Sequence, residues 1–318
     1  MKQLLLSVGI GLCCIGPPLF AGEKVDQTLA ADKDGYVEIE HINGYVDIKV
    51  WDKAEVRVVG ELGERTKQFI FERDGNEIVI NVKAKNGQGR HNWSSDDGDK
   101  LEIFIPKDSK VNYSSVNSDV KGTGIEGGAH FDTVNGDIEV NGLAGRIRLE
   151  SVNGDISASK LKGDVKIETV NGEIRSTSSS GKKDRYESVN GDIVITSGSR
   201  EINAETVNGD IKLALREIKH LNLDTVNGSI EAKLNLQPGG EVRASSVGGS
   251  VSLYFQEEVS ARFDIRGHAG GKIVNKLSDD QVQKAKYGPS RWLEFSMNSG
   301  NGRVNVSTVS GRVRLDTQ

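Results

Sequence analysis

The hexapeptide Ser/Thr-Val-Asn-Gly-Asp/Glu-Ile recurs along this chain at an almost constant interval. Successive copies, counted between their asparagines and including softer forms at both ends, lie 18, 18, 18, 19, 18 and 19 residues apart. The asparagines are Asn117, Asn135, Asn153, Asn171, Asn190, Asn208 and Asn227. So regular a period indicates a stack of coils, each one supersecondary unit resting on the last.

The residues between two copies of the hexapeptide predict how one coil is built. In residues 145–162, Ile147 and Leu149 alternate with charged residues, which is the pattern of a strand with one apolar face. Asn153-Gly154 then forms a tight corner, and the alternation resumes at Ile156. We therefore expect an all-β parallel β-solenoid with coils of about 18 residues and irregular capping ends, each coil holding two short strands and two turns.

Stacking places equivalent residues of successive coils in columns about 4.8 Å apart. We expect the asparagines to form a structural ladder whose amides bond along the column and satisfy buried turn backbone. Two further columns are apolar, one of valines and one of isoleucines. They contain Val134, Val152, Val170, Val189, Val207, Val226 and Val247, and Ile138, Ile156, Ile174, Ile193, Ile211, Ile230 and Val251.

The sequence outside the regular repeats divides the chain into four regions. Gln281–Ala285, within the last region, could form a helical turn. The predicted regions are a signal peptide (1–21), N-terminal β-rich capping coils (22–110) with a mobile polar loop at 85–99, regular solenoid repeats (111–253), and C-terminal coils and a cap (254–318).

Residues 1–21 predict export. Lys2 precedes about a dozen apolar residues, which are too few for a stable membrane span and end at Pro17-Pro18. Cys13 and Cys14 leave a lipid anchor as an alternative, although the residues before them do not match the usual approach to a lipidated cysteine. No other cysteine follows, so the exported chain would be held by its core alone. We expect an exported protein, periplasmic or at the cell surface, with no membrane span.

Two acidic columns are the candidate binding residues. The first is Asp137, Asp155, Glu173, Asp192 and Asp210, and the second is Asp132, Glu150, Glu168, Glu187, Glu205 and Asp224. Like charges at this spacing repel by roughly 1 kcal/mol or more per pair at a surface-like dielectric. Calcium could relieve that repulsion. Pairing with Arg148, Lys166 and Arg185, two residues before their glutamates, is the alternative that we favour, and we expect no metal site and no cofactor.

Motifs for catalysis are missing from the sequence. It contains no Gly-x-Ser-x-Gly elbow, no His-Glu-x-x-His and no phosphate loop, and its five histidines follow no ligand spacing. Carboxylates alone could still support polysaccharide cleavage, as in some β-helix enzymes. The acidic residues here belong to the repeat itself, whereas a catalytic site would break the repeat locally.

The repeat resembles a bacterial family. Together with Val50-Trp51-Asp52 and Leu101-Glu102-Ile103-Phe104-Ile105-Pro106, it is similar to the exported β-strand-repeat proteins of the DUF4097 type, often described as adhesins. The resemblance covers roughly residues 34–318 and implies a β-solenoid fold. It implies no established reaction, cofactor or catalytic residue.

These observations predict a non-enzymatic envelope protein that binds or scaffolds an extended partner, with an adhesin-like role as one option. The partner would be an envelope polysaccharide or an envelope protein, because long solenoid faces suit extended ligands. A net charge of −5 argues against a nucleic-acid partner. We expect a monomer, and the alternative function is a polysaccharide-cleaving enzyme of the β-helix type.

Overall fold

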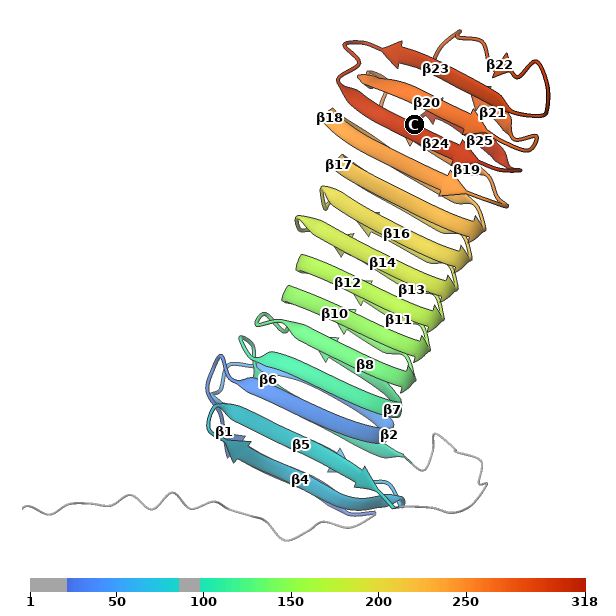
Figure 1. Ribbon diagram of the computed structural model, residues 1–318. Coiled ribbons are helices and arrows are strands. Elements are labelled where there is room, and N and C mark those ends of the chain that lie inside the picture. The colour runs from blue at the N-terminus through green and yellow to red at the C-terminus, as the bar shows by residue number, and fades with distance from the viewer. Residues whose placement is uncertain (1–21, 86–97) are drawn as a thin grey trace, which may run out of the picture.

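The chain is an elongated stack of strands (Figure 1). The computed structural model describes residues 22–85 and 98–318, which form 25 strands and no helix. The strands are joined by hydrogen bonds into one continuous sheet. The predicted signal peptide and nearly all of the predicted polar loop lie outside the described residues. Within the described residues no helix is long and apolar enough to cross a bilayer.

The regular coils are built from a longer and a shorter strand, which in three places run on as one strand of 14 or 17 residues, and equivalent positions of successive coils pair in parallel. Ile147 pairs with Val165, and Ile156 pairs with Ile174, so the register equals the sequence period. The strands of the stack are β7 (Lys110–Thr123), β8 (Ala129–Asn135), β9 (Ile138–Asn141), β10 (Ala144–Asn153), β11 (Ile156–Ser159), β12 (Lys162–Asn171), β13 (Ile174–Ser179), β14 (Lys183–Asn190), β15 (Ile193–Ser197), β16 (Glu201–Asn208), β17 (Ile211–Asn227), β18 (Ile230–Ser246) and β19 (Val251–Phe255).

Coils that contain extra residues accommodate them at local shifts of the strand register. The extra residue between Asn171 and Asn190 falls at Ser178, which has a φ of 59° and sits where the register of β13 with β15 shifts. The insertion at residues 237–240 faces a second register shift, between Ile218 and His220 on the neighbouring coil. The turn chemistry therefore changes while the parallel pairing continues on either side.

The predicted isoleucine column forms part of the core. Its members, Ile138 to Val251, pair with one another from coil to coil and are at most 1% exposed. Inward residues of the longer strands, such as Ile147 and Leu149, face them and are equally buried. The core is therefore a thin column of aliphatic layers that runs the length of the stack.

Two residues of the hexapeptide fix the distance between coils at the corner. The Ser/Thr hydroxyl donates to the glycine carbonyl of the preceding coil, as in Thr206 Oγ1 to Gly191 O at 3.1 Å. The glycine itself lies against that same carbonyl column, so that a Cβ at Gly191 would overlap the carbonyl oxygen of Gly172. Glycine is required here by close backbone approach.

The N-terminal end of the stack is closed by antiparallel strands. Strand β2 forms one full coil that pairs in parallel with β5, β6 and β7, while β1, β3 and β4 join by antiparallel pairing. These strands are β1 (Lys24–Ala30), β2 (Tyr36–Trp51), β3 (Glu55–Glu61), β4 (Thr66–Asp74), β5 (Glu77–Ala84) and β6 (Asp99–Pro106).

The C-terminal coils do not stack in chain order. The last strands, β24 (Gly302–Thr308) and β25 (Arg312–Thr317), lie between β18/β19 and β20/β21. Strand β23 then pairs antiparallel with β20. The helical turn considered for residues 281–285 is wrong, because Gln283 and Lys284 pair with β23, and that pairing overrides a weak local preference. The other strands here are β20 (Ala261–Gly267), β21 (Lys272–Asn275), β22 (Gln283–Lys284) and β23 (Arg291–Met297).

The glycine contact predicts a large effect for one methyl group. We expect Gly191→Ala to destabilise the protein by about 3 kcal/mol or more, because the new Cβ would push two coils apart. Gly198→Ala is the matched control, since its nearest neighbour would be Arg216 Cδ at 3.7 Å. Thermal unfolding followed by circular dichroism checks both variants. Equal midpoints for the two would contradict the proposed contact.

Candidate functional site

The asparagine ladder follows the corner of the stack. Each Asn Nδ2 donates to the Oδ1 of the asparagine one coil earlier, as from Asn153 to Asn135 at 2.8 Å and from Asn208 to Asn190 at 2.8 Å. Asn117, Asn135, Asn153, Asn171, Asn190, Asn208 and Asn227 all take part. The side chains are exposed to solvent, so the expectation that they satisfy buried turn backbone is wrong. Their amides bond to one another instead.

The first acidic column also bonds along the corner. Asp137 Oδ1 accepts the backbone N–H of Asp155 at 2.8 Å, and Asp192 Oδ1 accepts that of Asp210 at 2.8 Å. Asp155 and Asp210 accept from Glu173 and Ser229 in the same way. Glu173, one carbon longer, pairs with Arg175. These carboxylates therefore join successive coils, and their binding of a ligand remains a prediction.

The second acidic column lies on a different surface, the outward face of the longer strands. On this face, outward residues of successive coils form four parallel rows. In coil 183–190 the rows are represented by Lys183, Arg185, Glu187 and Val189. The third row is the second acidic column, Asp132, Glu150, Glu168, Glu187, Glu205 and Asp224.

The expected charge pairing is present over three coils. Lys166 Nζ lies 2.6 Å from Glu168 Oε2, and Arg148 and Arg185 pair with Glu150 and Glu187. In the following coils, asparagines replace the cations. Asn203 Nδ2 donates to Glu205 at 2.6 Å, and Asn222 Nδ2 donates to Asp224 at 2.8 Å.

Repulsion persists within the paired part of this row. Burial raises the pKa of Glu187, and its contact with Glu168 raises it further. Burial also opposes ionisation of Glu168, but Lys166 and the contact with Glu187 hold the pKa of Glu168 below its usual value. The two carboxyls therefore ionise at different pH, as expected for neighbouring like charges.

The fourth row is an exposed valine stripe. Nine valines at the hexapeptide position are 36–48% exposed, although valine is normally buried. They are Val116, Val134, Val152, Val170, Val189, Val207, Val226, Val247 and Val309. Between this stripe and the acidic row runs a groove of about 590 Å³, which extends from Asp132 to Val247. We call it the valine–carboxylate groove.

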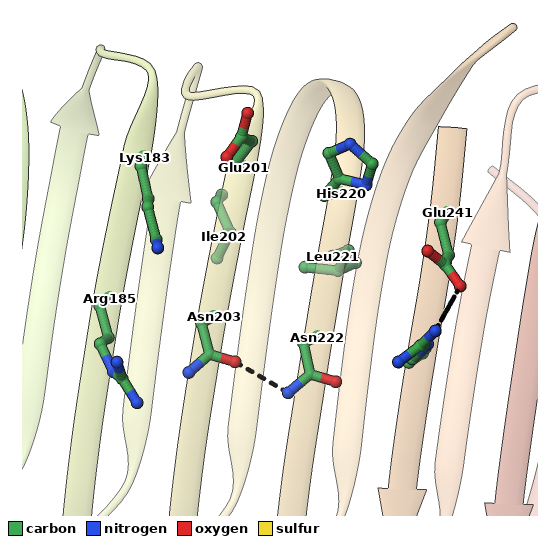
Figure 2. Close-up of a pocket in the computed structure, with 10 residues that line it drawn as sticks. Lys183, Arg185, Glu201, Ile202, Asn203, His220, Leu221, Asn222 and Glu241 are labelled. Atoms are coloured by element: carbon green, nitrogen blue, oxygen red, sulfur yellow. Dashed lines mark hydrogen bonds and ion pairs between the residues drawn. The ribbon is translucent and has the colours of Figure 1, made fainter. Parts of the chain in front are cut away.

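A second hollow, of about 420 Å³, lies over the first two rows (Figure 2). Lys183, Glu201, His220 and Glu241 follow one another from coil to coil in its first row, and its second row contains the hydrogen bond from Asn222 Nδ2 to Asn203 Oδ1 at 2.8 Å. The hollow is polar and of mixed charge. Within the described residues, no cluster of three His, Asp or Glu side chains has an arrangement that could hold a metal ion.

The coil that contains residues 183–190 departs chemically from the repeat inside the core. Asp184 stands in the inward column between Val165 and Ile202 and is fully buried. Its Oδ2 accepts hydrogen bonds from Ser179 and Ser197 at 2.9 Å each and from Tyr186 at 3.2 Å. Burial raises the pKa of Asp184, and the surrounding hydroxyls offset this only in part. Sequence analysis missed this cluster, although aligning the coils by their period places an Asp at an apolar position.

A second buried polar network lies near the N-terminal end. His41 Nδ1 is 2.9 Å from Ser118 Oγ, and His41 Nε2 is 3.0 Å from Asp99 Oδ2. Thr66 Oγ1 and the backbone N–H of Gly63 donate to Asp99 Oδ1 at 2.5 and 2.7 Å. In the sequence, His41 stands at the Ser/Thr position of His41-Ile42-Asn43-Gly44, which echoes the hexapeptide, but the sequence does not reveal its buried polar partners.

The order Ser118–His41–Asp99 resembles a catalytic triad, but its geometry does not support catalysis. The ring nitrogens are used the opposite way round, because in a serine-hydrolase triad the serine contacts Nε2 and the carboxylate contacts Nδ1. All three side chains are also almost fully buried, so Ser118 has no access to a substrate. We assign the network to packing of β2 against β6 and β7.

The fold and these surfaces define a β-strand repeat protein whose outward face carries continuous rows of equivalent side chains. The Toastrack DUF4097 family model matches residues 36–283, and the chain belongs to this family. A search among curated proteins gave no match.

Two solved structures are similar to this chain. One is a proposed cell adhesion protein from Clostridium sporogenes, with 8% identity, coverage of 93% of this chain and 100% of that chain, and a TM-score of 0.24. The other is a proposed adhesin from Bacteroides fragilis, with 11% identity, coverage of 92% and 97%, and a TM-score of 0.40.

The buried position of Asp184 predicts a gain in stability on its neutralisation. The pKa of Asp184 is raised in the folded chain. Its favourable contribution to the free energy of unfolding is therefore complete only below its pKa in the unfolded chain, and is lost as the pH rises through its pKa in the folded chain. We expect Asp184→Asn to raise the melting temperature at pH 7 by roughly 2–4 °C and to change it little near pH 3. The exposed Asp164→Asn is the control. A lower melting temperature for Asp184→Asn at pH 7 would refute this account.

Asp99 predicts the opposite pH dependence. Burial acts to raise the pKa of Asp99, but hydrogen bonds from His41 and Thr66 outweigh burial and lower it. The stabilisation by Asp99 is therefore present above its pKa in the unfolded chain and is lost as the pH falls through its pKa in the folded chain. We expect Asp99→Asn to destabilise by about 1–3 kcal/mol at pH 7. The difference from wild type should shrink below about pH 4. Urea unfolding across this range checks it, with the exposed Asp34→Asn as control. A deficit that does not change with pH would contradict the assignment.

Proposed function

We propose that this chain is a non-enzymatic parallel β-solenoid of the cell envelope that binds an extended partner along the outward face of its longer strands. The observation that carries the proposal is the straightness of the four rows. Parallel pairing in one register places equivalent side chains about 4.8 Å apart over many coils. Such a surface matches a linear ligand better than a compact one.

The first residues of the chain support an envelope location, where an adhesin-like role is one option. Residues 1–21 have the composition of a signal peptide. The partner would be an envelope polysaccharide or an envelope protein. Both ends of the stack carry antiparallel strands in place of a bare parallel coil, which favours a monomer.

The alternative of a polysaccharide-cleaving enzyme receives no support from the described residues. The carboxylates of the outward face recur with the repeat, and the departure from the repeat at Asp184 is fully buried. The Ser118–His41–Asp99 network is likewise closed to solvent. We therefore propose binding without catalysis.

Retention by envelope material tests this function. The purified protein, immobilised on beads, should retain material from a solubilised envelope fraction of its source cells, and beads carrying an unrelated acidic protein should not. Identical retention by both kinds of bead would count against the proposal. A glycan panel incubated with the protein should release no new reducing or unsaturated ends.

Location is tested separately with protease. We expect added protease to cleave the protein either on intact cells or once the outer layer has been opened, and we expect none of it in the cytoplasmic fraction. Cleavage on intact cells indicates the surface and an adhesin-like role, whereas cleavage only after opening indicates the periplasm. Recovery of the protein with the cytoplasmic contents would contradict both.

A further inference from the structure

The valine of the hexapeptide differs from its five neighbours in having no evident role inside the molecule. The Ser/Thr hydroxyl, the asparagine amide, the glycine and the acidic residue all join successive coils, and the isoleucine is buried. A β-branched residue suits this strand position, but threonine would meet that need without exposing apolar surface. Nine coils nevertheless carry a half-exposed valine. A continuous exposed apolar stripe of this kind marks an interaction surface.

Charge restricts what can lie on the stripe. Beside it, the acidic row contributes six carboxylates between Asp132 and Asp224. Over the seven coils of the groove, the adjacent row contributes four cations, Arg148, Lys166, Arg185 and Arg243. The two rows together therefore carry two excess negative charges. The excess is greatest at Glu205 and Asp224, which receive hydrogen bonds only from neutral side chains.

We propose, on the basis of the binding function above, that the valine–carboxylate groove binds an extended polypeptide segment in which basic and apolar residues alternate. Successive side chains of an extended chain point in opposite directions. One set then lies on the valines while the other reaches the carboxylates. The groove spans seven coils, roughly 29 Å at the strand spacing, which accommodates about nine extended residues.

Other occupants fit the groove less well. Its lining contains no aromatic side chain on which a sugar ring could pack. A second copy of this chain would bring a second row of carboxylates to the same surface. A cationic apolar peptide neutralises the excess charge and covers the valines together, and its binding should weaken as salt screens the carboxylates.

The test uses fluorescence anisotropy with the purified protein and labelled ten-residue peptides. The probe alternates Lys and Val; one control peptide alternates Glu and Val, and another alternates Lys and Ser. We expect the Lys/Val peptide to bind at least tenfold more tightly than either control and to weaken with added salt. Equal binding of all three peptides, or binding of none, would overturn the proposal.

Variants locate the binding. Val170→Thr/Val189→Thr/Val207→Thr and, separately, Glu187→Gln/Glu205→Gln/Asp224→Asn should each weaken the Lys/Val peptide about tenfold or more. Val194→Thr in β15 and Glu231→Gln at the start of β18, neither of which lines the groove, should leave it unchanged. Unfolding midpoints establish that every variant folds. Groove variants that bind as wild type would place the peptide elsewhere and overturn the proposal.

Three further outcomes separate this inference from the function on which it rests. If the groove variants retain envelope material as wild type does, the binding function stands and the groove assignment fails. If sedimentation shows a dimer that the valine variants abolish, and the peptide does not bind, the occupant is a second copy and the inference is wrong. If wild type retains no envelope material, the proposed function fails, whatever the peptide result.

Discussion

The rest of the structure depends on the close approach of successive coils at the Asn-Gly corner. Parallel ladder hydrogen bonds set a spacing of about 4.8 Å, and the glycine column permits that spacing where the chain turns, because any side chain there would overlap the carbonyl of the previous coil. Once the corner is fixed, the hydroxyl, amide and carboxylate of neighbouring positions fall within hydrogen-bond distance of their equivalents. One backbone constraint thus accounts for four of the six residues of the hexapeptide.

This constraint explains how much of the fold could be predicted from the sequence. The period revealed the coil, the alternation of Ile147 and Leu149 with charged residues identified the inner face, and the isoleucine column followed from both. Insertion of β24 and β25 between earlier coils could not be predicted, because the order of stacking at an end depends on which edge is free, not on local pattern. The same holds for β22, whose two residues become a strand only because β23 lies beside them.

Individual surfaces were less predictable than the architecture. Both acidic columns were visible in the sequence, but only the structure separates them, one bonded into the corner and the other on an open face beside the valines. Periodicity identifies residues that share an environment, but at a corner it does not show whether that environment is buried or exposed to solvent. The asparagines illustrate the difficulty, since their amides form the expected ladder in solvent and not in a buried turn. Asp184 was missed because it departs from the repeat in a single coil, and the network of His41 was missed because its partners Ser118 and Asp99 come from strands distant in sequence.

The two kinds of departure from the repeat have different physical consequences. Asp184 and the His41 network place polar groups in the core, where they are enclosed by hydroxyls and influence stability and its pH dependence. On the outward face, cations give way to Asn203 and Asn222 while the carboxylates and valines continue, so the charge changes without any change in backbone. A stack of coils can therefore vary its outward surface coil by coil at little cost to folding, because outward side chains do not take part in stacking at the corner. In the valine–carboxylate groove, such variation leaves valine surface exposed to solvent and carboxylates in excess over the neighbouring cations.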